Sequence, residues 1–302
     1  MNAARSRDWR TVGALAVAVL AVSSSAPLIA YAAAPALAVA FWRNGLAATA
    51  LTPVSLGPRR AELCAADRRD LLFCVLAGVA LAAHFATWMP SVQIGSVATA
   101  TALVATQPVW QGLIAFGQGK RPPSAVWLGI GCAVGGAAWA TGADVAVSGR
   151  AVLADVLALL GGMFAAVYTA LGERARSRLS TTSYTWICYG VCAVLLLGGC
   201  LAIRAPLTGY DANTWLAVLA LVAGAQLLGH SMFSYALHRT KATTVSVLIL
   251  LETPGAALIA WWWLGQRPRA GAVPGLVLLL VGVLVVTLGG RFSADATELS
   301  AH

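Results

Sequence analysis

Glu252 is the residue of this sequence best placed for chemistry inside an apolar segment. It lies near the middle of the apolar run over residues 243–264 and is followed by Thr253 and Pro254. Proline lacks a backbone N–H and therefore opens the hydrogen-bond ladder of a helix. Apolar surroundings favour the neutral, protonated form of a carboxyl group. We therefore expect Glu252 to bind a proton or a cationic group of a ligand, with a role in helix packing alone as the alternative.

Gln107 and Pro108 form a matching motif near the centre of another apolar run, over residues 95–117. If the two runs pack against each other, Gln107 faces Glu252 across the interior. Gln107 is therefore a second candidate for ligand binding. The neighbouring threonines are expected to bond to their own helices, as hydroxyls in membrane helices commonly do.

Arg43 is a third candidate, in the outer third of the apolar run over residues 36–56. An ionisable residue within such a run is costly and marks a functional position by default. It could bind an anionic carboxylate of a ligand or pair with an acid such as Asp155. Its long stem also allows the charge to reach the membrane interface. The sequence leaves these alternatives open.

Five further side chains complete the candidate binding residues: His84, His230, Ser24, Trp88 and Tyr168. The two histidines could carry protons on either side of a gate, or form hydrogen bonds between helices. Ser24 stands in a Ser-Ser-Ser-Ala-Pro interruption of the first apolar run, which can expose carbonyl groups to a cavity. The two aromatic residues could stack on an aromatic or cationic substrate.

The sequence contains no catalytic or metal-binding motif. It lacks Gly-x-Ser-x-Gly, His-Glu-x-x-His and the Walker-type phosphate loop. Cys188 and Cys192 are four residues apart, but no further ligand completes a metal site at the required spacing. We therefore expect no catalytic residue, no metal and no cofactor, and neither an enzyme nor a self-contained ATP-driven pump.

The composition is that of an integral membrane protein. Of the 302 residues, 59% are hydrophobic and 10% are charged, against about 45–50% and about 25% in soluble domains. The chain carries 20 Lys and Arg against 11 Asp and Glu. These bases lie in short runs between apolar segments without interleaved aromatic residues, so we expect no nucleic-acid partner.

Apolar runs between charged or Pro/Gly breaks predict ten transmembrane helices in an all-α integral membrane protein. The runs cover residues 11–31, 36–56, 70–90, 95–117, 124–141, 152–171, 183–203, 213–236, 243–264 and 271–290. With the N-terminus in the cytoplasm, fifteen of the 20 basic residues lie on the cytoplasmic side. The positive-inside rule therefore predicts a multi-pass protein of the inner (plasma) membrane with both termini cytoplasmic.

The halves of the chain form an internal repeat when the sequence is shifted by 146 residues. The shift aligns Gly78 with Gly224, His84 with His230, Pro108 with Pro254, Gly129 with Gly275 and Gly136 with Gly282. Five helices per unit is an odd number, so the second unit must enter the membrane from the opposite side. Inverted repeats of this kind build many secondary transporters, with the substrate site at the midplane.

The repeat also divides the chain. We expect a cytoplasmic N-terminus (1–10), a first five-helix repeat (11–141), an extracytoplasmic linker (142–151), a second repeat (152–290) and a cytoplasmic tail (291–302). The small residues around Ala34 offer a signal-peptidase site as an alternative. Cleavage there would leave nine helices and break the repeat, so an uncleaved first helix is favoured.

With these features the chain resembles the EamA family of the drug/metabolite transporter superfamily. The resemblance covers roughly residues 11–290 and rests on the two five-helix halves, Leu-Glu-Thr-Pro at 251–254, Trp-Leu-Gly-Gln-Arg at 263–267 and Phe-Trp-Arg-Asn at 41–44. The family often has glutamate after the Leu-Gly pairs that close the fourth and ninth helices. This chain has Gln118 and Gln266 there, so a role for those glutamates does not carry over.

These observations lead us to expect a secondary-active transporter working by alternating access. The resemblance implies small metabolites such as amino acids, or amphipathic drugs, as substrates, with export as the common direction. We expect a small-molecule substrate, the lipid bilayer and protons as partners, and leave open whether the chain forms a homodimer. The alternative is a lipid-handling flippase or a membrane scaffold of the same fold.

Overall fold

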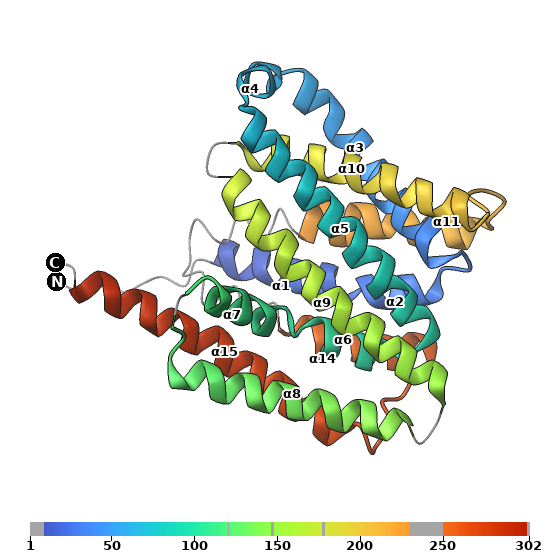
Figure 1. Cartoon of the computed structure of the whole chain (residues 1–302). Coiled ribbons are helices and arrows are strands. Elements are labelled where there is room, and N and C mark those ends of the chain that lie inside the picture. Colours follow the sequence, from blue (N-terminus) through green and yellow to red (C-terminus); the bar gives the residue numbers. More distant parts are fainter. Residues whose placement is uncertain (1–8, 120, 146–147, 177–178, 230–249, 301–302) are drawn as a thin grey trace.

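The computed structural model describes residues 9–119, 121–145, 148–176, 179–229 and 250–300, and all regular structure in these ranges is helical (Figure 1). The elements are α1 (Trp9–Ser23), α2 (Ser25–Tyr31), α3 (Ala36–Leu56), α4 (Arg60–Ala65), α5 (Arg68–Ile94), α6 (Val97–Val104), α7 (Gln107–Gly117), α8 (Ser124–Val145), α9 (Gly149–Ala175), α10 (Thr181–Ala202), α11 (Ala212–Ala220), the π-helical η1 (Leu221–Gly229), α14 (Glu252–Leu264) and α15 (Val273–Ser300).

The all-α prediction is confirmed for the described residues, and helices occupy each of the ten predicted runs. Four helical stretches are long and apolar enough to cross a membrane: α5, α9, α10 and the continuous stretch Ala212–Gly229. Three shorter apolar stretches cover Leu15–Tyr31, Ser124–Ala140 and Val273–Gly289. The number of ten membrane crossings stays a prediction.

The helices depart from the predicted runs mainly at their polar ends. α15 continues through much of the predicted tail to Ser300, and α8 and α9 extend into the predicted linker at 142–151. The Ser148 hydroxyl starts α9 by accepting from the Ala151 N–H at 3.2 Å. An apolar run marks the part of a helix that prefers lipid, whereas helical hydrogen bonding continues until a capping residue ends it.

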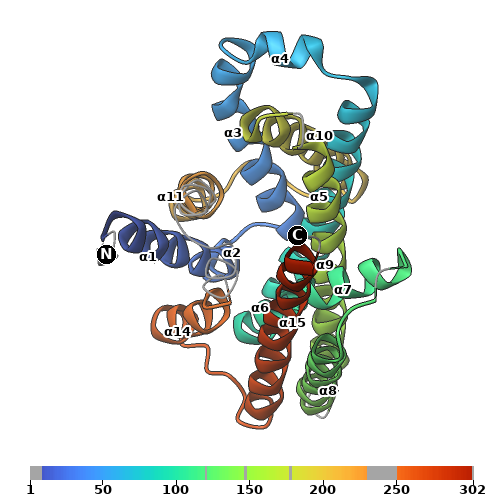
Figure 2. The ribbon, with the colours of Figure 1, turned by 90° about the vertical axis from the view of Figure 1, so that its left-hand side faces the viewer.

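Four glycines allow α8 and α15 to pack closely along each other, and both views show the two helices side by side (Figures 1 and 2). Gly129 lies against Gly282, and Gly136 lies against Gly275. The earlier glycine of α8 meets the later glycine of α15, so the two helices run antiparallel. A Cβ atom on Gly136 would lie 2.4 Å from the Leu279 nitrogen and 2.6 Å from the Gly275 oxygen. Backbone atoms cannot make room for it, so this crossing requires glycine.

The contacts between the two halves of the chain are symmetric. When each helix is replaced by the one that the 146-residue shift relates to it, the same pairs of helices are in contact. α3 packs on α10 and α8 packs on α15, and each pair joins helices at matching places in the 146-residue repeat. The contact between α5 and α9 has its counterpart in the contact between α1 and η1, and that between α7 and α9 in that between α1 and α14. The glycine pairs obey the same rule, because the shift exchanges Gly129–Gly282 with Gly136–Gly275.

Polar contacts join the connecting segments in two separate groups. At the end predicted to be cytoplasmic, the Glu62 carboxylate of α4 accepts from the backbone N–H of Ser180. Ser180 is the N-cap residue of α10. At the other end, the contacts are Ala33 N–H to Thr214 Oγ1 at 3.2 Å, Trp42 Nε1 to the Leu207 carbonyl at 2.7 Å, Gln93 Nε2 to the Ala34 carbonyl at 2.9 Å and Val97 N–H to Gln266 Oε1 at 3.3 Å. Each contact joins segments that the predicted topology places on the same side.

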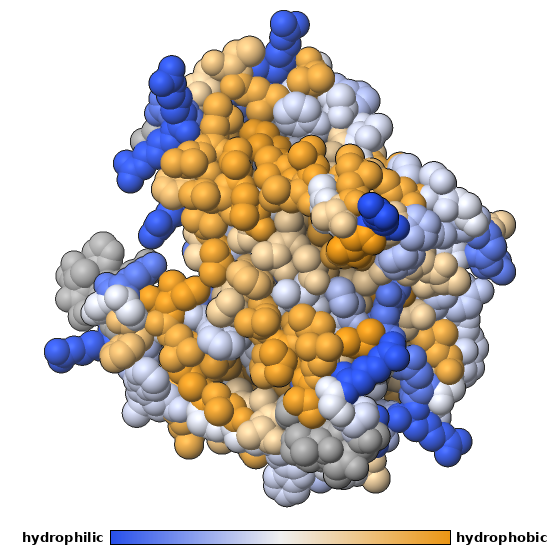
Figure 3. All heavy atoms as spheres, turned by 45° about the vertical axis from the view of Figure 1, so that its right-hand side comes forward, coloured by the Kyte–Doolittle hydropathy of each residue, from blue (hydrophilic) through white to orange (hydrophobic). Residues whose placement is uncertain are grey.

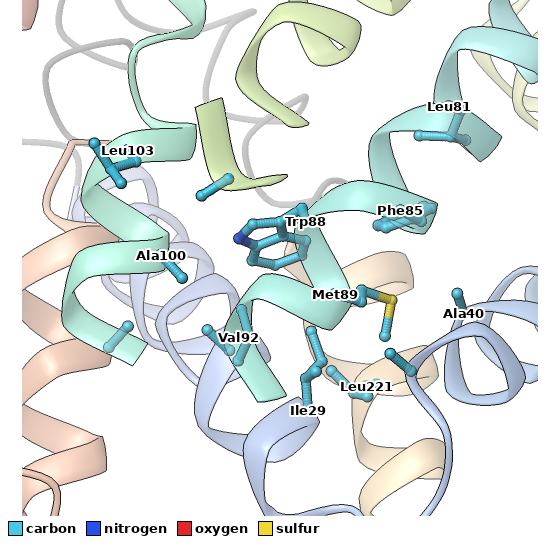
Figure 4. Packing of buried hydrophobic residues seen from close by; sticks show 14 of the residues in the cluster. Ile29, Ala40, Leu81, Phe85, Trp88, Met89, Val92, Ala100, Leu103 and Leu221 are labelled. Atoms are coloured by element: carbon cyan, nitrogen blue, oxygen red, sulfur yellow. The ribbon is translucent and has the colours of Figure 1, made fainter. Parts of the chain in front are cut away.

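Apolar side chains fill the interior and also cover much of the outside. Ile29, Met89, Leu103 and Leu221 are among the largest fully buried side chains. Ile29, Met89 and Leu221 meet where α2, α5 and η1 approach one another, and Leu103 lies further away on α6 (Figure 4). On the face in Figure 3, hydrophobic residues cover the middle while hydrophilic ones gather mostly at the margins. Outer residues such as Leu20 and Val194 are 66% and 69% exposed, an arrangement that suits contact with lipid rather than water.

We predict that Gly136→Ala destabilises the protein by about 1–3 kcal/mol, the usual cost of overpacking a close contact. Gly131→Ala in the same helix is the matched control, because a Cβ atom there meets nothing within 4 Å. Alanine is the better helix former, so the control should be neutral or slightly more stable. Thermal unfolding in mild detergent measures both variants. Equal midpoints for the two would contradict the close α8–α15 crossing.

We predict that the contact between α4 and the start of α10 weakens in acid. Slight burial raises the pKa of Glu62, but hydrogen bonds from Ser180 and Ser183 and the charge of Arg59 outweigh it and leave the pKa below its usual value. The folded state therefore binds the Glu62 proton less readily, so the stabilisation is present above the unfolded pKa of about 4.3 and is lost as pH falls through the folded value.

Unfolding midpoints of the wild-type chain and Glu62→Gln, compared between pH 7 and pH 3, test this. The wild type should be more stable at pH 7, and the difference should shrink in acid. A difference that is constant over this range would show that the Glu62 charge has no part in the contact.

Candidate functional site

Polar side chains gather where two helices are interrupted and a third begins. α1 and α2 meet at Ser24, η1 replaces α-helical turns after α11, and α14 begins at Glu252. These interrupted segments contact one another, since η1 packs on α1 and α2, and α14 also packs on α1 and α2. Interrupted helices free backbone groups and side chains to line a polar site inside an apolar bundle.

Arg43 of α3 lies at the centre of this cluster and is only 5% exposed. Its Nε donates to the Gln226 side-chain oxygen, and its Nη1 donates to Ser25 Oγ at 3.2 Å. The guanidinium lies over the Phe85 ring, 4.8 Å from its centroid. The structure thus places Arg43 in the interior rather than at the membrane interface.

Gln226 and Asn44 hold the arginine in place from opposite halves of the chain. Both side chains are buried, at 2% and 0% exposure. Gln226 Nε2 donates to Asn44 Oδ1 at 3.2 Å, and Asn44 Nδ2 donates to the Ala40 carbonyl at 2.8 Å. Tyr189 of α10 also lies within electrostatic range of Arg43. A buried polar network of this kind is stable only when its members are satisfied together.

Glu252 is half-buried at the first position of α14. Its carboxylate interacts electrostatically with Arg43, but the two form no direct ion pair in the part of the chain that the structure describes. The next residue ties α14 to α6, since Thr253 Oγ1 donates to the Thr101 carbonyl at 3.3 Å. An acidic and a basic side chain therefore approach one another in the interior without touching.

Gln107 does not join this cluster through any contact in the described ranges. Its Nε2 donates to Thr169 Oγ1 of α9 at 2.8 Å. Counted from the matched prolines, the position equivalent to Glu252 is Thr106, whose hydroxyl donates to the Leu103 carbonyl at 2.6 Å. Gln107 and Glu252 are nevertheless alike in one respect, because each begins a helix and has a proline in its first turn.

His84, Trp88 and Tyr168 lie where α5, α9 and α10 pack together. His84 Nδ1 lies 2.9 Å from the Gly161 carbonyl, and its ring stacks on Trp88 with centroids 5.5 Å apart. Tyr168 stacks on Tyr184 at 6.3 Å. His84 therefore makes the interhelical bond that was the alternative to proton transfer, although it also lies within electrostatic range of Arg43.

The remaining candidates divide between the cluster and its surroundings. Ser24 donates to the Ala21 carbonyl of its own helix at 2.8 Å, while the adjacent Ser25 contacts Arg43. His230 lies outside the described residues. Trp88 is 5% exposed and its Nε1 has no acceptor among the described residues; its indole lies beside α6 near Ala100 and Leu103 (Figure 4).

Sequence reasoning missed Ser25, Asn44, Gln226 and Tyr189. Gln226 carried a usable signal, because it is a large polar residue inside the predicted run 213–236, and such residues mark functional positions. Asn44 directly follows Arg43 and had the same signal. No sequence feature identified Gln226 as the partner of Arg43, because they are 183 residues apart.

The arrangement is that of a helical bundle with a polar cluster in its apolar interior. A family model described as the EamA-like transporter family matches residues 9–142 and again 152–288. The chain therefore belongs to the EamA-like transporter family and is a multi-pass membrane transporter, so the resemblance seen in the sequence is confirmed.

The chain is also similar to a curated protein sequence and to a solved structure. It is 25% identical over 142 residues to an "uncharacterized transporter" of Archaeoglobus fulgidus, a match that covers 46% of this chain and spans about half (49%) of that curated relative. A crystal structure of another protein superposes with a TM-score of 0.60 at 20% identity, covering 93% of this chain and 98% of the other. At this identity the second likeness shows the fold alone.

We predict that Gln226→Leu destabilises the protein by about 1.5–3 kcal/mol, because the Arg43 Nε would be left buried without its acceptor. Gln118→Leu, at an exposed position after α7, should change stability by less than about 0.5 kcal/mol. The midpoint of thermal unfolding in detergent measures both. Similar values for the two would mean that the arginine does not depend on Gln226.

Proposed function

We propose that the chain is a secondary-active transporter that moves small metabolites, such as amino acids, or amphipathic drugs across the inner membrane by alternating access. Export is the proposed direction, with both termini in the cytoplasm. The observation that carries the proposal is the buried cluster around Arg43, which takes its side chains from both halves of the chain. A site shared by two halves is exposed to one side or the other when the halves move against each other.

The packing of the halves supports an inverted repeat with boundaries near 11–141 and 152–290. The contacts of the helices are preserved when the halves are exchanged, and α8 and α15, which the exchange relates, are antiparallel. A two-fold axis that relates antiparallel helices runs across them, and so lies in the membrane plane if these helices cross the membrane. The grouping of loop contacts at two separate ends supports the proposed topology.

Glu252 is the proposed coupling group. It lies in the cluster, within electrostatic range of Arg43 and at the start of a helix. A carboxyl group in this position can take up a proton on one side of the membrane and release it on the other. Its proton would then be exchanged for substrate, so that a proton gradient drives export.

We predict that Glu252→Gln removes the stimulation of transport by a pH gradient but retains exchange of substrate between equal pools. The test is flux of a panel of amino acids, nucleosides, polyamines and lipophilic cations in proteoliposomes. Glu173→Gln, an exposed position at the end of α9, is the control and should keep the stimulation. Transport by Glu252→Gln with an unchanged pH dependence would refute proton coupling.

The same vesicles test the transport proposal as a whole. Folded protein that moves no member of the panel but exchanges labelled lipid between leaflets would favour the lipid-handling alternative. Protein that moves neither would favour a scaffold.

A further inference from the structure

Arg43 has more hydrogen-bond donors than the described residues around it offer acceptors. A guanidinium carries five N–H groups, and among the described residues Arg43 donates to one oxygen of Gln226 and one of Ser25. In the part of the chain that the structure describes, Nη2 has no acceptor. Leaving buried donors of a charged group unpaired is costly, so a site with unused donors is poised to receive an acceptor from outside the protein.

The guanidinium is fixed in orientation by contacts on its Nε side, on Nη1 and on one face. Gln226 holds Nε, Ser25 holds one hydrogen of Nη1, and Phe85 covers one face of the planar group at 4.8 Å. Among the described contacts, one N–H of Nη1 and both of Nη2 remain, and in a planar guanidinium Nη1 and Nη2 each direct one N–H to the outer edge. Two parallel N–H groups match the two oxygens of a carboxylate in a bidentate pair.

The charge balance of the cluster selects the kind of anion. Arg43 supplies one positive charge, and Glu252 faces it without a direct ion pair among the described residues. The other side chains that hold the arginine, Gln226, Asn44 and Ser25, are neutral. One cation beside an acid suits a group with a single negative charge and opposes a dianion such as a phosphate monoester.

We infer that Arg43 binds the carboxylate of the transported substrate, and that the substrates are small organic carboxylates. This inference rests on the proposed function. A substrate that also carries an ammonium group would direct it towards Glu252, so that both charges of the cluster are met. Gln226 is a positioning residue that aligns the guanidinium for the substrate without contacting it.

The test uses sets of three compounds with one skeleton, such as phenylalanine, its carboxylate-only analogue 3-phenylpropionate and its amine-only analogue phenethylamine, with an aliphatic set beside it. Binding to the purified full chain is measured by thermal stabilisation and by competition. We expect compounds with a carboxylate to bind and the amines of the same skeleton to bind at least about 30-fold more weakly, which corresponds to about 2 kcal/mol.

Three variants assign this preference to the site. Arg43→Gln should lose the preference for carboxylates. Gln226→Glu should keep the fold and also lose carboxylate binding, because its own carboxylate neutralises the charge of the arginine; it serves where Arg43→Gln does not fold. Arg267→Gln, at an exposed arginine over the Trp261 ring, is the control and should bind as the wild type does.

Two results would overturn the inference: amines that bind as well as the acids, or carboxylate binding that survives in both Arg43→Gln and Gln226→Glu. Flux of amines and neutral solutes in the same preparation separates the two proposals. Where such solutes are transported and carboxylates are not, the transport function stands and the carboxylate site fails. Where folded protein transports nothing, both fail.

Discussion

A guanidinium inside an apolar helix bundle is costly unless polar groups surround it on several sides. Arg43 meets this requirement by hydrogen bonds to Ser25 and Gln226, with Asn44 completing the network. These residues come from α2, α3 and η1, so the three elements must meet at one level of the bundle. The interruption at Ser24, the π-helical turns of η1 and the start of α14 all lie around this charge. The cluster therefore joins α2, α3 and η1 at the level where the helices are interrupted.

The two halves are joined in two different ways. At α8 and α15, four glycines bring backbone against backbone, and the contact tolerates no added side-chain atom. Around Arg43, the halves are joined by hydrogen bonds between side chains, which can be exchanged for bonds to a ligand at little cost. The two halves are thus held by a close crossing at one place and by an exchangeable polar contact at another. This combination suits two halves that move against each other while staying attached. It is the arrangement on which the proposed alternating access of this chain rests.

The sequence was sufficient for much of the fold. Apolar runs located the helices because length and hydropathy determine which segments enter lipid, and the 146-residue shift related glycines that do pack together. The extension of α15 to Ser300 and the short α4 were missed, because helices in water depend on caps that hydropathy does not report.

The candidate site was predicted in part. Arg43 and Glu252 stood out as charges within apolar runs, and the structure brings them within electrostatic range. The partner of Arg43 was not predictable, because the direction in which Gln226 points depends on the π-helical turns of η1. Gln107 was assigned to the interior by its run alone, but the face of its helix turns it towards Thr169.

The most direct test of the central claim is the accessibility of Ser25, which touches Arg43 and is 3% exposed in this structure. A cysteine at this position, in a chain whose exposed Cys64 and half-buried Cys132 are replaced by serine, would be treated with a membrane-impermeant thiol reagent from each side of oriented vesicles. Alternating access predicts modification from both sides, at rates that a transported substrate lowers. Modification from one side alone, or from neither in a transporting protein, would contradict it.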